Sequence, residues 1–281
     1  MPTATCDGIE TRYEVTGDGP PLLLFSPGGF NATIENWRAF GIYRRLNLLD
    51  RLAGRFTCIA FDKRESGESG GRVEPLTWDG YARQGAALLD HLGIERAHLL
   101  GGCIGCSIAV AFAVAWPGRV ERMVLYSPAG GPRYRMTQQA RFAEHLAFVE
   151  QAGLDGVVEP ARESDRTFAQ DPRLGPWVSV LRLDDAFAAD YPRQDPAAYR
   201  ALVEQTALQL FDRDTVPGPE PERLLELETP ALVVPGRDPS HATSAARYLE
   251  ECLPRSEYWD VPPEEQTAGT APSRLLAFLE D

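Results

Sequence analysis

Short apolar runs alternate with helical stretches along most of the chain. Residues 9–15 alternate between apolar and polar positions, which is typical of a half-buried strand. Further strands are predicted at residues 22–25, 57–61, 98–100, 123–126, 231–234 and 258–259, and helices at residues 81–92, 107–116, 244–252 and 273–279. Such alternation is typical of a parallel sheet with crossover helices, so we expect an α/β fold with a mainly parallel sheet of about eight strands.

The pattern changes between residues 130 and 228. This segment is rich in Arg, Asp and Pro, and it has helical stretches but no run that is typical of a buried strand. The strand pattern then returns at residue 231. We therefore predict that residues 1–129 and 229–281 form the α/β core and that residues 130–228 form an inserted helical cap.

A nucleophile elbow is predicted where Gly101, Cys103 and Gly105 lie between a buried strand and an apolar helix. In such a turn the central residue has a strained backbone, and glycines two positions away avoid a steric collision. The N-terminus of the helix lowers the pKa of a thiol and supplies an N–H to a developing oxyanion. Cys103 is therefore the candidate nucleophile, and the backbone N–H of Ile104 is a candidate oxyanion donor.

Several motifs accompany this elbow. They are Gly19-Pro20-Pro21-Leu22 with Gly28-Gly29, the stretch at residues 61–69, Pro117-Gly118-Arg119-Val120, and Pro235-Gly236-Arg237-Asp238. Together with residues 97–105 they resemble the motifs of the α/β-hydrolase superfamily over nearly the whole chain. The resemblance implies an α/β-hydrolase fold with a helical cap, an oxyanion loop at Gly28 and Gly29, and a catalytic acid at Asp238.

The sequence departs from the family pattern in several motifs. Ser26-Pro27 stands where the family usually has His-Gly, and Glu65 stands where it has a glycine. Asp238 follows Gly236 one residue closer than in the usual G-x-x-D. A carboxylate that caps the next helix is the alternative interpretation of Asp238, but the preceding strand favours the catalytic acid.

The loop at residues 260–269, which holds the catalytic His in the family, contains no His here. Glu265 or Gln266 falls near the expected position. Because a carboxylate desolvated under a cap can have its pKa raised towards neutrality, Glu265 is the first candidate for the base. An amide such as Gln266 can orient water but cannot accept its proton. A thiol also needs less activation than a hydroxyl, which agrees with a cysteine at the elbow.

The four histidines of the chain lie elsewhere. His145 shares a helical face with residues 142 and 149 and is a candidate for reaching the site from the cap, although a packed, hydrogen-bonded His is the commoner outcome on an apolar face. His241 follows Asp238 by three residues and is interpreted either as a partner of that loop or, more commonly, as an exposed residue at a helix start. His91 and His98 are interpreted as structural.

The composition and net charge of the chain indicate which partners and which cell compartment to expect. A net charge of −13 disfavours nucleic acid and anionic membranes, and no apolar run reaches the roughly 18–20 residues of a membrane span. Five scattered cysteines indicate a reducing cytoplasm, and because no second Cys/His pair at zinc-ligand spacing accompanies Cys103 and Cys106, we expect no metal site. We expect a small-molecule substrate and no cofactor, and the sequence leaves the oligomeric state open, a homodimer included.

These features favour an enzyme of acyl-transfer type that cleaves an ester, a thioester, a lactone or a related carbonyl compound through Cys103. The alternative is a non-hydrolytic member of the fold, either a ligand-binding pseudoenzyme or a cofactor-independent lyase, because a thiol without a base would stall as an acyl-enzyme. A weaker hypothesis is a thiol–disulfide protein that uses Cys103 and Cys106.

Overall fold

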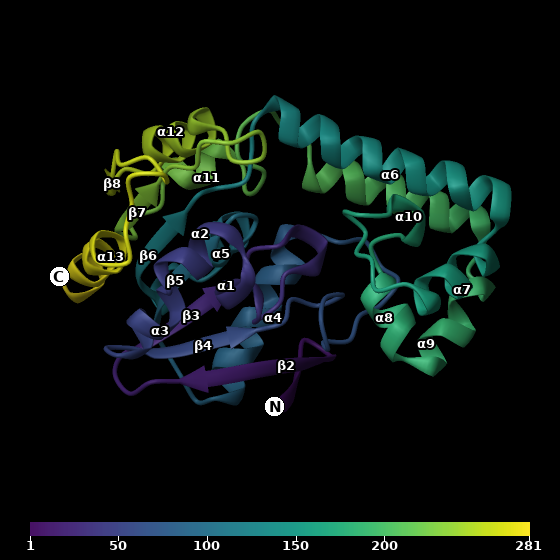
Figure 1. Cartoon of the computed structure of the whole chain (residues 1–281), viewed down its shortest axis with the longest axis horizontal. Helices are drawn as coiled ribbons and strands as arrows, with labels where there is room; N and C mark the ends of the chain where they lie inside the picture. Colours follow the sequence, from purple (N-terminus) through teal and green to yellow (C-terminus); the bar gives the residue numbers. More distant parts are fainter.

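An eight-stranded sheet forms the centre of the computed structural model, which describes all 281 residues (Figure 1). The strands are β1 (Thr3–Cys6), β2 (Ile9–Thr16), β3 (Pro21–Phe25), β4 (Thr57–Phe61), β5 (Ala97–Gly102), β6 (Val120–Tyr126), β7 (Ala231–Val234) and β8 (Ser256–Tyr258), in the order β1-β2-β4-β3-β5-β6-β7-β8. Strand β2 runs antiparallel to both of its neighbours, and all the other neighbours are parallel. The prediction of a mainly parallel α/β sheet is confirmed.

Helices cover both faces of this sheet. They are α1 (Asn36–Ala39), α2 (Gly41–Leu46), α3 (Leu48–Ala53), α4 (Trp78–His91), α5 (Gly105–Ala115), α12 (Thr243–Cys252) and α13 (Thr270–Glu280). Successive strand residues point to opposite faces, so Leu23 belongs to the core cluster that includes residues of α4, α5 and α12, and Leu22 to the cluster that includes residues of α2, α3 and α13. Helix α5 is buried nearly all round because it lies directly under the sheet. This burial explains why its sequence has no polar face.

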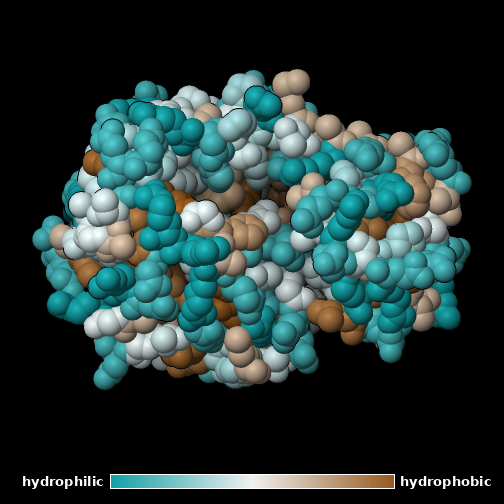
Figure 2. All heavy atoms as spheres, viewed as in Figure 1, coloured by the Kyte–Doolittle hydropathy of each residue, from teal (hydrophilic) through white to brown (hydrophobic).

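The chain between β6 and β7 contains helices and no strand of the sheet (Figure 1). We call residues 130–228 the helical insertion. Its α-helices are α6 (Pro132–Ala152), α7 (Asp155–Glu163), α8 (Val178–Leu183), α9 (Asp185–Asp190), α10 (Pro196–Leu210) and α11 (Pro221–Leu225). No helix of the chain combines the length and the apolar character needed to cross a bilayer. The visible surface is mostly hydrophilic, with separate hydrophobic patches (Figure 2).

Aromatic packing joins the helical insertion to the loop that follows β3. The ring of Phe30 lies 5.4 Å from that of Phe142 and 5.3 Å from that of Phe168, both edge to face. Phe142 and Phe168 are fully buried members of the insertion. Edge-to-face pairs of this kind add about 0.5–1.5 kcal/mol each beyond the area that they bury. The insertion is therefore held directly beside Gly28 and Gly29.

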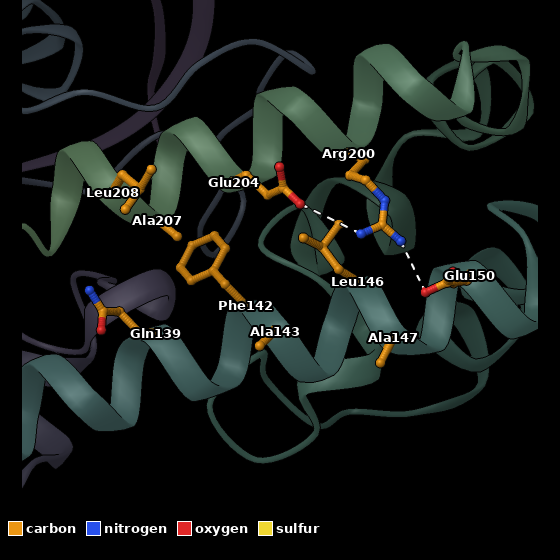
Figure 3. A pocket seen from close by; sticks show the side chains of 10 residues that line it. All are labelled: Gln139, Phe142, Ala143, Leu146, Ala147, Glu150, Arg200, Glu204, Ala207 and Leu208. Atoms are coloured by element: carbon orange, nitrogen blue, oxygen red, sulfur yellow. Dashed lines mark hydrogen bonds and ion pairs between the residues drawn. The ribbon is translucent and has the colours of Figure 1, made fainter.

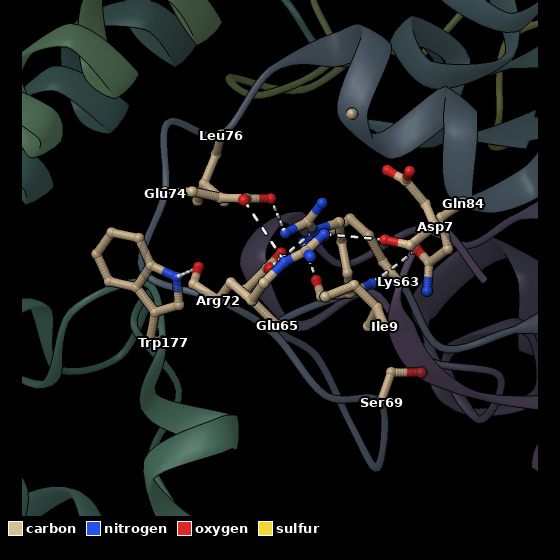
Figure 4. Close-up of polar contacts among 12 residues, drawn as sticks. Asp7, Ile9, Lys63, Glu65, Ser69, Arg72, Glu74, Leu76, Gln84 and Trp177 are labelled. Atoms are coloured by element: carbon tan, nitrogen blue, oxygen red, sulfur yellow. Dashed lines mark hydrogen bonds and ion pairs between the residues drawn. The ribbon is translucent and has the colours of Figure 1, made fainter. Parts of the chain in front are cut away.

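The loop after β4 makes a second connection to the helical insertion (Figure 4). The indole N–H of Trp177 donates to the carbonyl of Arg72 at 2.7 Å. Within the loop, the buried carboxylate of Glu65 pairs with Arg64 at 2.8 Å. Glu65 has φ 61°, a left-handed conformation that glycine adopts more easily, which explains why the family motif has glycine at this position.

Close packing at the elbow generates a stability prediction. A Cβ placed on Gly105 would lie 2.0 Å from the carbonyl oxygen of Phe25, so Gly105→Ala must displace α5 from β3. We expect this variant to lower the free energy of unfolding by roughly 1–3 kcal/mol. Gly118→Ala, where a Cβ meets nothing within 4 Å, is the matched control and should have little effect in the same denaturant titration. Equal stabilities for the two variants would contradict the packing described here.

Candidate active site

Cys103 occupies a tight turn between β5 and α5. Its φ is 55°, a left-handed conformation that costs a non-glycine residue about 1–3 kcal/mol. The turn is held by the N–H of Cys103, which donates to the carbonyl of Tyr126 at 3.1 Å, and by its carbonyl, which accepts from Cys106 and Ala129 at 3.2 Å. The geometry is that of a nucleophile elbow and leaves the thiol partly exposed at the end of the strand.

Two backbone N–H groups are directed at the sulfur of Cys103. One belongs to Ile104, the first residue after the turn, and the other to Gly28 in the loop after β3. Gly28 has φ 126°, which only glycine adopts readily, and a Cβ there would lie 2.3 Å from the side-chain nitrogen Nδ2 of Asn36. Gly29 follows with φ 65° and lines the cavity above the sulfur. An anion formed beside Cys103 would meet the same two donors.

His241 and Asp238 lie together on the loop after β7. The Asp238 carboxylate accepts a hydrogen bond from Nδ1 of His241 at 2.8 Å. Its other oxygen accepts from the backbone N–H groups of Ser240 at 2.8 Å and of His241 at 3.1 Å. The second ring nitrogen of His241, Nε2, is buried and has no hydrogen-bond partner of normal geometry. The imidazole is thus oriented by a carboxylate at Nδ1, which leaves Nε2 for an interaction with the Cys103 thiol.

The Cys103 thiol interacts with this imidazole. Burial raises the pKa of Cys103, but attraction to His241 and the N–H groups of Gly28 and Ile104 outweigh it, so the pKa lies below the ordinary thiol value. Burial lowers the pKa of His241, but Cys103 and Asp238 outweigh it and raise the pKa to about 9. The pKa of Asp238 is lowered because His241 offsets its burial. All three shifts are in the direction that stabilises a thiolate on Cys103 and a proton on His241.

The loop at residues 260–269 contributes no base to this arrangement. Glu265 is exposed and does not line the cavity that holds Cys103. Gln266 is fully buried, where it accepts a hydrogen bond from the hydroxyl of Tyr126 and donates to the carbonyl of Val261 at 2.7 Å. Gln266 therefore fastens this loop to the end of β6, and the imidazole next to the sulfur comes from another loop.

His145 lies away from the sulfur, inside the helical insertion. It is fully buried, and its ring nitrogens contact the carbonyl of Arg173 at 3.1 Å and the hydroxyl of Tyr199 at 2.6 Å. Burial lowers its pKa to about 4, so it is neutral at physiological pH. His145 thus has the packed, hydrogen-bonded environment that is commoner for a histidine on an apolar face.

Cys106 is buried beneath the elbow. Its thiol lies 3.1 Å from the carbonyl of Gly101 and 3.5 Å from that of Tyr126, to which it donates. Burial raises its pKa well above the ordinary thiol value. All five cysteines are free thiols, and no three His, Cys, Asp or Glu side chains are grouped in a way that could hold a metal ion.

A cavity of about 790 Å³ opens above Cys103. The core contributes residues of the loops after β3, β6 and β7, and the helical insertion contributes polar residues of α6 and of the segment that follows α7. The lining includes Gly28, Gly29, Cys103, Asp238 and His241 from the core, and Tyr134, Gln138, Arg141, Thr167 and Gln170 from the insertion. A volume of this size accommodates a small organic molecule.

A separate groove of about 550 Å³ lies between α6 and α10 (Figure 3). Its lining is mainly apolar, and its charged groups are occupied by one another, since Arg200 pairs with Glu150 at 3.0 Å and with Glu204 at 3.5 Å. No nucleophile or imidazole lines it. The candidate active site is therefore the cavity above Cys103.

Comparison with known proteins gives a match to the model of the alpha/beta hydrolase family over residues 23–269. A putative carbamate hydrolase, RutD, from Azorhizobium caulinodans is 33% identical over 264 residues, which cover 93% of this chain and 89% of that protein. A 2-hydroxy-6-oxononadienedioate/2-hydroxy-6-oxononatrienedioate hydrolase from Paraburkholderia phymatum is 28% identical over 82% of this chain and 75% of that protein.

An acetyltransferase component of an acetoin cleaving system from Cupriavidus necator is 36% identical over 127 residues, which are 45% of this chain and only 32% of that protein. Among solved structures, a meta-cleavage product hydrolase (CumD) covers 99% of this chain and 97% of its own, with a TM-score of 0.63 and 19% identity. An enol-lactonase from Burkholderia xenovorans covers the same shares with a TM-score of 0.60 and 20% identity. These structural matches support the same fold.

The Cys103–His241 contact generates a reactivity prediction. Alkylation of Cys103 by iodoacetamide should titrate below pH 9.0, the ordinary thiol value, because the thiolate is stabilised by His241. His241→Gln should move this titration to higher pH, because burial raises the pKa of Cys103 and the imidazole that lowers it is then absent. Peptide mass spectrometry measures the rate at each cysteine, and partly exposed Cys252, whose pKa is raised by burial, is the internal control. Faster alkylation of Cys252, or an unchanged titration in His241→Gln, would contradict the contact.

Proposed function

This chain belongs to the alpha/beta hydrolase family, and from that premise we propose that it hydrolyses an ester, a thioester or a lactone through a covalent acyl intermediate on Cys103. The observation that carries the proposal is the line of contacts from Asp238 through His241 to the Cys103 thiol, at an elbow with two N–H donors. Nucleophile, base and orienting carboxylate are thus assigned to Cys103, His241 and Asp238.

In the first half-reaction the Cys103 thiolate attacks the substrate carbonyl carbon and forms a C–S bond. The carbonyl oxygen becomes an oxyanion and accepts hydrogen bonds from the N–H groups of Gly28 and Ile104. When the tetrahedral intermediate collapses, the bond to the leaving group breaks and His241 donates its proton to the departing alkoxide or thiolate. The products of this step are an acyl-Cys103 thioester and the alcohol or thiol, which for a lactone stays attached to the acyl chain.

In the second half-reaction His241 is neutral and takes a proton from water as the water oxygen attacks the thioester carbonyl. Collapse of this second intermediate breaks the C–S bond and releases the carboxylic acid. The thiolate and the imidazolium are restored together, so the resting ion pair is regenerated. Asp238 keeps the imidazole in one orientation and stabilises its positive charge in both steps.

A base beside the sulfur favours hydrolysis over the binding-only and lyase alternatives. Those alternatives depend on the absence of a histidine from residues 260–269, because an acyl-Cys103 without a base would not be hydrolysed. His241 supplies this function from the loop after β7. Glu265 need not act as a base, and its side chain is exposed and lies outside the cavity.

The helical insertion acts as a cap in this proposal, with boundaries at residues 130 and 228. It contributes the upper wall of the cavity and is packed against Phe30 next to the oxyanion donors. Covering the site in this way excludes bulk water and strengthens the hydrogen bonds to the oxyanion. According to their names, the relatives described above act on a carbamate, a keto acid or an enol-lactone. These names support a carbonyl substrate for this chain.

Three substitutions test the assignment of roles. We expect Cys103→Ala to abolish both turnover and the covalent adduct, and His241→Gln to reduce turnover by about 10²–10⁴-fold because the general base is lost. Glu265→Gln should turn over like the wild type. Turnover is measured on a panel of esters and thioesters, and adducts by intact mass. A strong loss in Glu265→Gln with a normal His241→Gln would reverse the assignment.

The raised pKa of His241 predicts the pH dependence of acylation. The imidazolium loses its proton as the pH rises through about 9, so the acylation rate with an alkyl ester should fall there. A thioester with an acidic leaving thiol needs no proton and should show a weaker fall. Pre-steady-state bursts measure this rate, and an alkyl-ester acylation that stays constant or rises above pH 9 would show that His241 is not the proton donor.

A further inference from the structure

One face of helix α6 forms part of the cavity above Cys103. Tyr134, Gln138 and Arg141 line the cavity and are spaced four and three residues apart, so they lie on the same side of the helix. Tyr134 is close to the catalytic sulfur, since the charge of Cys103 contributes to raising its pKa. At 1.5 Å per residue, the Cα atom of Arg141 lies roughly 10 Å farther along the helix axis than that of Tyr134.

Arg141 is the only lysine or arginine that lines this cavity. It forms no ion pair, whereas most arginines of this acidic chain do; Arg135 on the same helix pairs with Asp214 at 3.2 Å. The only carboxylate in the lining, Asp238, is bound to His241. Arg141 is half-buried, so part of its hydration is already lost without a compensating anion. The cavity therefore contains one cation whose counter-ion is not supplied by the protein.

We propose that the substrate carries a carboxylate that Arg141 binds, several carbon atoms away from the carbonyl that Cys103 attacks. This inference rests on the proposed function and specifies its substrate class. The planar guanidinium can donate two parallel hydrogen bonds to a carboxylate, which fixes the orientation of the substrate as well as its charge. The separation along α6 assigns the carboxylate to the far end of the bound molecule, so that it does not approach the oxyanion donors or Asp238.

The proposal is tested with matched thioesters of hexanoic acid and of hexanedioic acid, which differ in a terminal carboxylate. Wild-type protein should prefer the hexanedioyl compound. Arg141→Gln should raise KM for that compound on the order of 10- to 100-fold and leave KM for the hexanoyl compound nearly unchanged. Arg141→Lys should keep part of the preference, because a lysine supplies the charge without the paired donors. Arg133→Gln, an exposed arginine of α6 outside the cavity, is the matched control.

Binding measured without turnover separates this inference from the proposed function. In a Cys103→Ala background, calorimetry should show tighter binding of the hexanedioyl thioester than of the hexanoyl thioester, and Arg141→Gln should remove the difference. This result would support the carboxylate site even if the wild type proved unable to hydrolyse either compound. Equal binding of the two thioesters, no binding of either, or the same loss for both in Arg141→Gln would overturn it.

Discussion

The turn at Cys103 is the constraint on which the rest of the site depends. A left-handed backbone at a non-glycine residue is unfavourable, and the packing of Gly101 and Gly105 against neighbouring backbone leaves no room for a looser turn. Strands β3 and β6, which are parallel to β5, and the buried helix α5 hold this strained turn in place. Its result is a thiol fixed at the carboxyl edge of the sheet, where the loops after β3 and β7 also begin. Because β3, β5 and β7 are parallel strands of the same sheet, the loops that follow them emerge at the same edge, where the donors and the imidazole meet at the sulfur.

The proposed triad places its acid and its base on one short loop. Asp238 and His241 are three residues apart, and the carboxylate also accepts two N–H groups of the same turn, so the pair is oriented locally. This arrangement leaves the loop after β8 without a catalytic task. Gln266 there is buried as a structural residue that binds Tyr126 and Val261. A cysteine suits the arrangement, because a thiolate beside an imidazolium is stable in the resting state whereas an alkoxide is not.

The sequence predicted most of the fold because its signals are local. Strands at residues 57–61 and 231–234 match β4 and β7, since each is a short, mainly apolar run that is buried on both faces. The edge strand β1 was missed because it has only four residues and a weak alternation. The elbow was predicted from Gly101, Cys103 and Gly105, but the partner of the sulfur was not. His241 gave a signal only through its spacing from Asp238, and the direction of a ring nitrogen depends on how a loop closes in three dimensions.

The central claim is that the proton of the Cys103 thiol resides on His241, so that the two residues form an ion pair. Its most direct test is an NMR titration of the His241 imidazole in the wild type and in Cys103→Ala, with the other histidines as internal references. We expect a pKa of about 9 for His241 in the wild type, and a clear fall in Cys103→Ala because the thiolate that raises it is gone. A wild-type pKa near the ordinary value of 6.5 that Cys103→Ala leaves unchanged would contradict the account.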